Sequence, residues 1–197
     1  MSLDAQRVPR DNNVSQLRDS VKERINRVSD AETEDQKTGL YLVTTHLKNP
    51  IGKATVEQQL QYVIDTVPLV YTHILNKTVK SHKFESRRQL HPLMLSFIDY
   101  SGSRENQHNF SQLPHVHSIL VVHPEVNSRF QDLRDNGFQL DQGNRNTARI
   151  TNIDVVDIER TDIDLETVID YSAKSYFLDF IPLVSAETKA DMMIING

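Results

Sequence analysis

The sequence predicts an α+β fold in which a central, mostly antiparallel sheet is flanked by helices. Runs rich in β-branched and aromatic residues alternate with polar segments that repeat apolar residues at helical spacing. The predicted order is helix, strand, helix, strand, strand, helix, strand, helix, which is typical of an antiparallel sheet with helices packed against it. At 197 residues, the chain is long enough for one domain with a full hydrophobic core.

The composition excludes several classes of protein and several kinds of metal site. Cysteine is absent, which excludes disulfides and thiolate metal sites. No run approaches the roughly 20 apolar residues of a membrane span, and no apolar signal core follows residues 1–11. We therefore expect a cytoplasmic protein with no membrane partner. The net charge of −5 argues against a general binder of polyanions.

The first half of the chain predicts two helices around one strand. Residues 13–35 form an amphipathic helix in this interpretation, because apolar residues recur at helical spacing at Val14, Leu17, Val21, Ile25 and Val28. Residues 40–47 (LYLVTTHL) predict a strand. Thr55 is a candidate N-cap for a helix to about Val67, whose end Pro68 should disturb.

The second half predicts three strands, at residues 92–100 (PLMLSFIDY), 114–123 (PHVHSILVVH) and 149–158 (RITNIDVVDI). Pro124 closes the second of these strands and begins a short helix, and Gly137 is a plausible residue just beyond its end. Thr161 and Asp164 match a capping box before a helix of roughly residues 162–180.

Charge is unevenly distributed along the chain. Residues 77–91 contain a basic run with five cations, Lys77, Lys80, Lys83, Arg87 and Arg88. Residues 151–170 contain seven acidic residues and one basic residue, Arg160. Each run is consistent with a solvated face. The alternative interpretation of the basic run is that it contacts phosphates.

His115-Val116-His117 lies in the predicted strand at residues 114–123. Because side chains alternate between the two faces of a strand, both histidines point the same way. Two imidazoles so placed can reach one divalent ion. A pair of ordinary strand histidines has the same pattern, so the triplet alone does not decide between the two interpretations.

The last predicted helix contains Tyr171-Ser172-Ala173-Lys174. Tyr171 and Lys174, at i and i+3, share a face of that helix. The predicted apolar stripe consists of Leu165, Val168, Ile169, Ala173, Tyr176, Phe177 and Phe180. Since Tyr171 and Lys174 lie on the other side of the helix, core packing does not explain Tyr171, whereas it does explain Tyr176.

These motifs, in this order, resemble those of the replication initiators (Rep) among the HUH endonucleases. Residues 40–47 resemble the first motif, an apolar strand ending in threonines. His115-Val116-His117 resembles the metal motif, and Tyr171 with Lys174 resembles the nucleophile motif of the single-tyrosine type. The resemblance covers roughly residues 38–180. It implies an HUH-like nuclease domain. We expect this domain to span residues 38–183, after a helical extension at 1–37 and before a C-terminal tail at 184–197.

The resemblance implies an enzyme that nicks and rejoins single-stranded DNA, to initiate rolling-circle replication or transfer of a mobile element. Tyr171, helped by Lys174, would become linked to the 5′-phosphate. His115 and His117 would hold Mg²⁺ or Mn²⁺. The third ligand has no fixed place in the family. If strands 92–100 and 114–123 pair antiparallel, Asp99 comes near His115, and a carboxylate suits these cations; the alternatives are Glu105 and His108.

The partners implied are single-stranded or hairpin DNA at a replication origin and a host helicase. The basic run would grip the DNA, mainly through phosphates. Gly52-Lys53 imitates the end of a P-loop, but Leu47 stands where the first glycine is needed, so we expect no ATPase in this chain. Two other functions remain as alternatives: a non-catalytic DNA-binding relative of the same fold, and a metal-binding α+β protein unrelated to DNA.

Overall fold

The computed structural model describes most of the chain between residues 37 and 173. The described ranges are residues 37–48, 55–100, 113–140, 143–158 and 165–172, the backbone of 173, 183–186 and 193–195, and six residues near the N-terminus, Arg18, Asp19, Lys22, Glu23, Ile25 and Asn26. These six are helical, as the spacing of apolar residues predicts. No helix within these ranges has the length and apolar character needed to cross a membrane.

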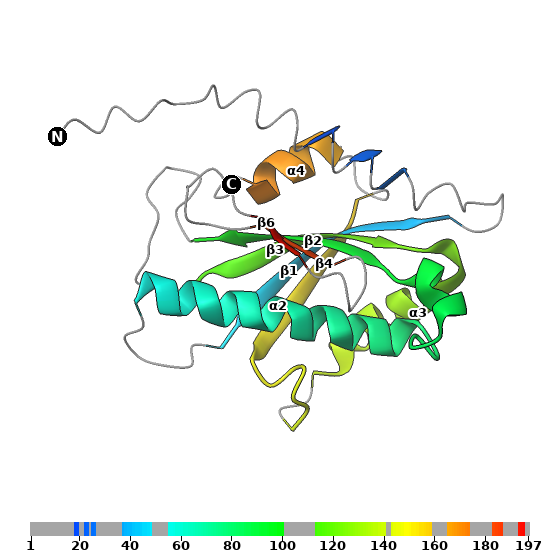
Figure 1. The fold of residues 1–197 in the computed structure, drawn as a ribbon, viewed down its shortest axis with the longest axis horizontal. Helices are drawn as coiled ribbons and strands as arrows, with labels where there is room; N and C mark the ends of the chain where they lie inside the picture. The colour runs from blue at the N-terminus through cyan, green and yellow to red at the C-terminus, as the bar shows by residue number, and fades with distance from the viewer. Residues whose placement is uncertain are drawn as a thin grey trace.

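An antiparallel sheet crosses the molecule, and its order among the described strands is β4-β1-β3-β2-β5-β6 (Figure 1). The strands are β1 (Gly39–Leu47), β2 (Leu93–Asp99), β3 (His115–Val122), β4 (Ile150–Asp157), β5 (Leu183–Ala186) and β6 (Met193–Ile195). Each pairing between these neighbours is antiparallel. The predicted α+β class with an antiparallel sheet is therefore confirmed.

Helices cover both faces of this sheet (Figure 1). They are α2 (Val56–Thr78), α3 (Pro124–Asp135) and α4 (Leu165–Ala173). Helices α2 and α3 lie on one face, and α4 lies on the other. Gly137 follows α3 with a φ of 60°, as expected for the residue after a helix end. The part of the last predicted helix after residue 173 lies outside the described residues.

Helix α2 is longer than the sequence predicts. Thr55 caps its first turn and forms a capping box with Gln58. We expected the helix to end near Pro68, but it continues to Thr78. The reason is packing, because the buried face continues at helical spacing on both sides of the proline, through Val63, Val67, Val70, Tyr71 and Ile74. Burying this face outweighs the cost of an interior proline, which is roughly 3 kcal/mol.

Alternation along the strands separates two hydrophobic cores. On β2, Ile98 packs in the core under α2 and α3, whereas Phe97 packs in the core under α4. Asp99 has the same parity as Phe97 and therefore lies on the α4 face. On β3, His115 and His117 fall on the α4 face for the same reason. The fold thus gathers these three polar side chains beneath α4.

Strands β5 and β6 continue the sheet beyond β2. The boundary that we placed between a domain ending at residue 183 and a tail at 184–197 therefore does not coincide with an edge of the sheet. With only four and three residues, these strands are too short to show a clear alternating pattern.

Candidate metal centre

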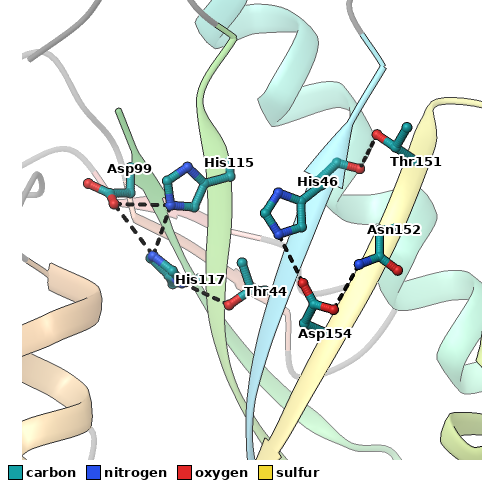
Figure 2. Close-up of polar contacts among 8 residues, drawn as sticks. All are labelled: Thr44, His46, Asp99, His115, His117, Thr151, Asn152 and Asp154. Atoms are coloured by element: carbon teal, nitrogen blue, oxygen red, sulfur yellow. Dashed lines mark hydrogen bonds and ion pairs between the residues drawn. The ribbon is translucent and has the colours of Figure 1, made fainter. Parts of the chain in front are cut away.

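Three side chains converge where β2 ends and β3 begins (Figure 2). Asp99 is the last residue of β2, and the antiparallel register pairs it with His115, the first residue of β3. His117 follows on the same face. Oδ2 of Asp99 lies 3.2 Å from Nε2 of His115 and 3.4 Å from Nε2 of His117. The two Nε2 atoms are 3.1 Å apart.

This triangle of ligand atoms has the size that a divalent cation requires. Neighbouring ligands about 2.1 Å from an octahedral ion lie roughly 3.0 Å from one another, and tetrahedral ligands lie roughly 3.4 Å apart. The three distances between the ligand atoms, 3.1, 3.2 and 3.4 Å, lie between about 3.0 and 3.4 Å. Asp99, His115 and His117 can therefore hold a metal ion. Three protein ligands leave coordination positions for water or substrate, as in catalytic sites.

A neighbouring strand orients one of these ligands. Oγ1 of Thr44, on β1, lies 3.0 Å from Nδ1 of His117, and the two residues are paired in the sheet register. When Nδ1 carries the proton and donates it to Thr44, Nε2 presents its lone pair to Asp99 and His115. A metal-ligating histidine ordinarily has such a partner on its other ring nitrogen.

Burial differs among the three ligands. The side chains of Asp99 and His117 are 1% and 3% exposed, whereas that of His115 is 23% exposed. A buried carboxylate is stable only beside compensating groups, and the two histidines or a bound cation provide them. His115 is therefore the candidate ligand through which the centre reaches solvent.

Tyr171 reaches this centre from α4. Its ring meets that of His117 edge to face, with centroids 4.8 Å apart. We expected Tyr171 on the side of the helix away from the apolar stripe, and this was wrong, because the side chain is partly buried and points to the sheet. In the described part of α4 the buried residues are Val168, Ile169 and Ser172. Tyr171 borders this stripe, and its long side chain spans the remaining distance to His117.

The other described tyrosines are poorly placed to act here. Tyr41, Tyr71 and Tyr100 are buried in the core under α2 and α3, on the far side of the sheet. Burial raises the pKa of the Tyr100 phenol to about 12 and also raises the pKa of Tyr41. Tyr62 lies on α2 beneath the guanidinium of Arg149. Among the described tyrosines, Tyr171 is therefore the one that contacts the centre.

Two residues that we did not predict as site residues adjoin the centre. The ring of His46, on β1, stacks on that of His115 with centroids 5.9 Å apart and planes 15° apart. Its Nε2 lies 3.1 Å from Oδ2 of Asp154, on β4. Strand alternation puts His46 on the same face as Thr44, so the sequence contained a signal for it. Asp154 could be placed only once β4 was known to pair with β1.

The basic run lies at the opposite end of β2 from the metal centre. Its cations, Lys77, Lys80, Lys83, Arg87 and Arg88, are all exposed. The run ends just before β2 begins, and the length of β2 corresponds to about 20 Å at roughly 3.4 Å per residue. Arg87 and Arg88 form surface ion pairs with Glu125 and Glu85. The structure thus does not bring the basic run to the metal centre.

Several candidate residues lie outside the described residues: Lys174, the alternative tyrosine Tyr176, and the alternative ligands Glu105 and His108. The centre that the structure does describe consists of Asp99, His115 and His117, with Thr44 and Tyr171 in contact with His117. Comparisons with family models, with curated proteins and with solved structures find no match to this chain. Its function must therefore be argued from the geometry of this centre.

Proposed function

We propose that this chain is a metal-dependent enzyme that nicks and rejoins single-stranded DNA through a 5′-phosphotyrosine intermediate. Its role would be to initiate rolling-circle replication or the transfer of a mobile element. The observation that carries the proposal is the contact between Tyr171 and His117. This contact brings the phenol that we propose as the nucleophile beside a group that can hold a metal ion. The order of motifs, which resembles that of the Rep branch of HUH endonucleases, supports the same conclusion.

In the proposed step, the phenolic oxygen of Tyr171 bonds to phosphorus as the bond from phosphorus to the 3′ oxygen breaks. The phenolic proton is released, and the departing oxygen takes up a proton, so the products are a phosphotyrosine and a free 3′-hydroxyl. A phenol is largely protonated at neutral pH, and we assign Lys174 to assist its ionisation. Attack by a 3′-hydroxyl on the phosphotyrosine reverses the step and joins strands.

The metal proposed for Asp99, His115 and His117 is Mg²⁺ or Mn²⁺, since a mixed oxygen and imidazole set suits these cations. When bound, it would stabilise negative charge on a non-bridging oxygen of the scissile phosphate. The chain's own contribution is to hold the three ligands in a triangle and to fix Tyr171 against one of them. Thr44 would contribute by accepting a hydrogen bond from Nδ1 of His117, which leaves Nε2 of that residue free to bind the metal.

The substrate should be single-stranded at the nick, because an intact duplex keeps the scissile phosphate out of reach of Tyr171. The basic run would contact a more distant part of the DNA, such as an origin hairpin, mainly through phosphates. A host helicase would then unwind the duplex ahead of replication.

A pool of random single-stranded oligonucleotides tests the proposal without knowledge of the origin sequence. The full chain is incubated with the labelled pool and Mn²⁺, and covalent adducts are separated on a denaturing gel. We expect an adduct with the wild-type protein in Mn²⁺, no adduct in EDTA, and none with Tyr171→Phe.

The two alternative functions predict different outcomes. A non-catalytic relative would retain single-stranded DNA, with a steep loss of binding as salt rises, but would form no adduct. A metal-binding protein unrelated to DNA would bind Mn²⁺ and show neither DNA binding nor an adduct. Either outcome would replace the nicking proposal.

A further inference from the structure

His115 has the least support of the three candidate ligands. Asp99 is buried, and His117 is held through Nδ1 by Thr44. His115 begins its strand and is partly exposed, and within the described part of the chain no hydrogen bond reaches its Nδ1. A histidine ligand without such a bond needs another means of fixing its ring, because a freely rotating imidazole loses entropy when it binds a metal.

A chain of contacts reaches His115 from the edge of the sheet. The amide Nδ2 of Asn152 donates to Oδ1 of Asp154 at 2.7 Å. The other carboxylate oxygen of Asp154 lies 3.1 Å from Nε2 of His46. The ring of His46 then stacks nearly parallel on that of His115. Figure 2 shows His46 between Asp154 and His115, on the same face of the sheet.

The backbone at His46 is also fixed. The register between β1 and β4 shifts between His46 and Leu47, and such irregularities reorient side chains next to functional sites. The hydroxyl of Thr151 donates to the carbonyl oxygen of His46 at 3.1 Å. The orientation of the His46 ring is thus set from both its backbone and its side chain.

We infer that His46 is a positioning residue, held by Asp154 and Asn152, whose ring fixes His115 in the orientation that binds the metal. The inference rests on the metal centre of the proposed function, but it does not require DNA nicking. His46 itself is not a ligand in this assignment, because its Nε2 is directed to Asp154 rather than to the triangle. What His46 supplies is a flat surface against one side of the His115 ring.

Calorimetric titration of the full chain with Mn²⁺, after treatment with EDTA and its removal, tests this assignment. We expect His46→Ala to weaken Mn²⁺ binding about tenfold, the lower end of the effect of residues that support metal ligands. His46→Phe keeps a flat ring and should bind Mn²⁺ more tightly than His46→Ala, close to the wild type. Asp154→Asn should give a smaller loss than His46→Ala, because the stacked ring remains.

Val156→Ala is the matched control, since Val156 is an exposed residue two positions from Asp154 on the same face of β4. It should leave Mn²⁺ affinity unchanged. All four variants should unfold at the wild-type temperature in EDTA, because His46, Asp154 and Val156 are all exposed. The absorption spectrum of bound Co²⁺ provides a second readout, and it should change in His46→Ala and return in His46→Phe.

Equal Mn²⁺ affinity in His46→Ala and the wild type would overturn the inference. So would a His46→Phe protein as weak as His46→Ala, which would indicate that the imidazole nitrogen is itself a ligand. A wild-type protein without a Mn²⁺ site would overturn both this inference and the metal centre. If these affinity differences appear in a protein that forms no DNA adduct, the inference stands and the nicking proposal fails.

Discussion

The ring of Tyr171 meets the ring of His117 edge to face, with centroids 4.8 Å apart, and this contact joins α4 to the metal centre. His117 therefore contacts Thr44 through Nδ1, Asp99 and His115 through Nε2, and Tyr171 through the face or edge of its ring. The contact places a phenol directly against one residue of a group that could hold a metal ion. Because the ring of Tyr171 makes this contact, a substitution that removes only the Tyr171 hydroxyl should leave the packing on His117 in place.

We predict that Tyr171→Phe abolishes the covalent protein–DNA adduct while leaving Mn²⁺ and DNA binding within about twofold. The substitution removes the nucleophilic oxygen but keeps the ring that packs on His117. The measurements are adduct formation on a denaturing gel, calorimetry with Mn²⁺, and fluorescence anisotropy with a labelled oligonucleotide.

Tyr176→Phe is the control for this prediction and should form the adduct at the wild-type rate. Mass spectrometry of a trapped adduct identifies the modified residue directly. A nucleotide on Tyr176, or an active Tyr171→Phe protein, would assign the nucleophile differently.

We predict that Asp99→Asn reduces Mn²⁺ affinity at least a hundredfold. Asparagine has nearly the same volume, so the change removes the charge of a side chain that is 1% exposed without opening a cavity. His117→Ala should remove the site altogether. Glu105→Ala and His108→Ala are the controls, and full affinity in Asp99→Asn with a loss in either control would identify a different third ligand.

The same variants should differ in thermal stability. A ligand at a hundred times its Kd stabilises the folded state by about 2.7 kcal/mol, which for a chain of this size raises the unfolding temperature by about 5–10 °C. We expect this rise on adding Mn²⁺ to the wild type and its absence in Asp99→Asn. An equal rise in both proteins, measured by differential scanning calorimetry, would place the cation elsewhere.

Local patterns in the sequence were enough to predict part of this centre. The alternation of side chains along a strand put His115 and His117 on one face. Pairing of two successive strands across their connecting loop put Asp99 opposite His115, and the observed register has this pairing. Both predictions depend only on residues near in sequence, where strand geometry leaves few alternatives.

Contacts that depend on distant strands were not predicted. Asp154 meets His46 only because β4 pairs with β1, and the sequence alone gave no signal for this pairing. The prediction for the side of α4 that carries Tyr171 was wrong. It used the apolar stripe of an isolated helix, which does not account for how the helix packs on the sheet. The helix end predicted near Pro68 was wrong for a similar reason, because tertiary packing outweighed the local preference of proline.

A buried histidine away from the centre makes stability depend on pH. His73 lies on α2, and its Nε2 is 2.7 Å from the carbonyl oxygen of Phe138, to which it donates. Burial lowers the pKa of His73 below the value of about 6.5 that is usual for histidine. The unfolded chain therefore binds the proton more readily, so stability is full above about pH 6.5 and falls as pH drops from there to the folded pKa.

We predict that His73→Gln flattens this loss of stability. Glutamine can donate to the same carbonyl oxygen but does not titrate. The slope of unfolding free energy against pH should decrease by at most about 1.4 kcal/mol per pH unit, the limit for one proton. Urea unfolding at several pH values in EDTA measures the slope. Burial also lowers the pKa of His123, but both proteins share it, so an unchanged slope would show that His73 does not contribute.

The basic run provides the last prediction, because its position separates DNA affinity from chemistry. Arg87 and Arg88 are exposed on the 3-10 helix Glu85–Leu90, at the opposite end of β2 from Asp99. Their ion pairs with Glu125 and Glu85 lie at the surface, where such pairs contribute little to stability. Both guanidinium groups can therefore exchange these partners for DNA phosphates at small cost.

Replacing Arg87 and Arg88 together with Ala should weaken DNA binding for all sequences alike. The slope of the logarithm of affinity against that of salt concentration should become shallower by roughly 1 to 2, because each phosphate contact contributes about 0.7 to 0.9. Mn²⁺ affinity, and the adduct rate at saturating DNA, should stay at wild-type values. Replacing Arg134 and Arg145, which lie outside the run, removes the same charge and is the control. An equal change of slope in both double variants would mean that overall charge, rather than this surface, determines the binding, and no change in either would assign the basic run to a solvated face.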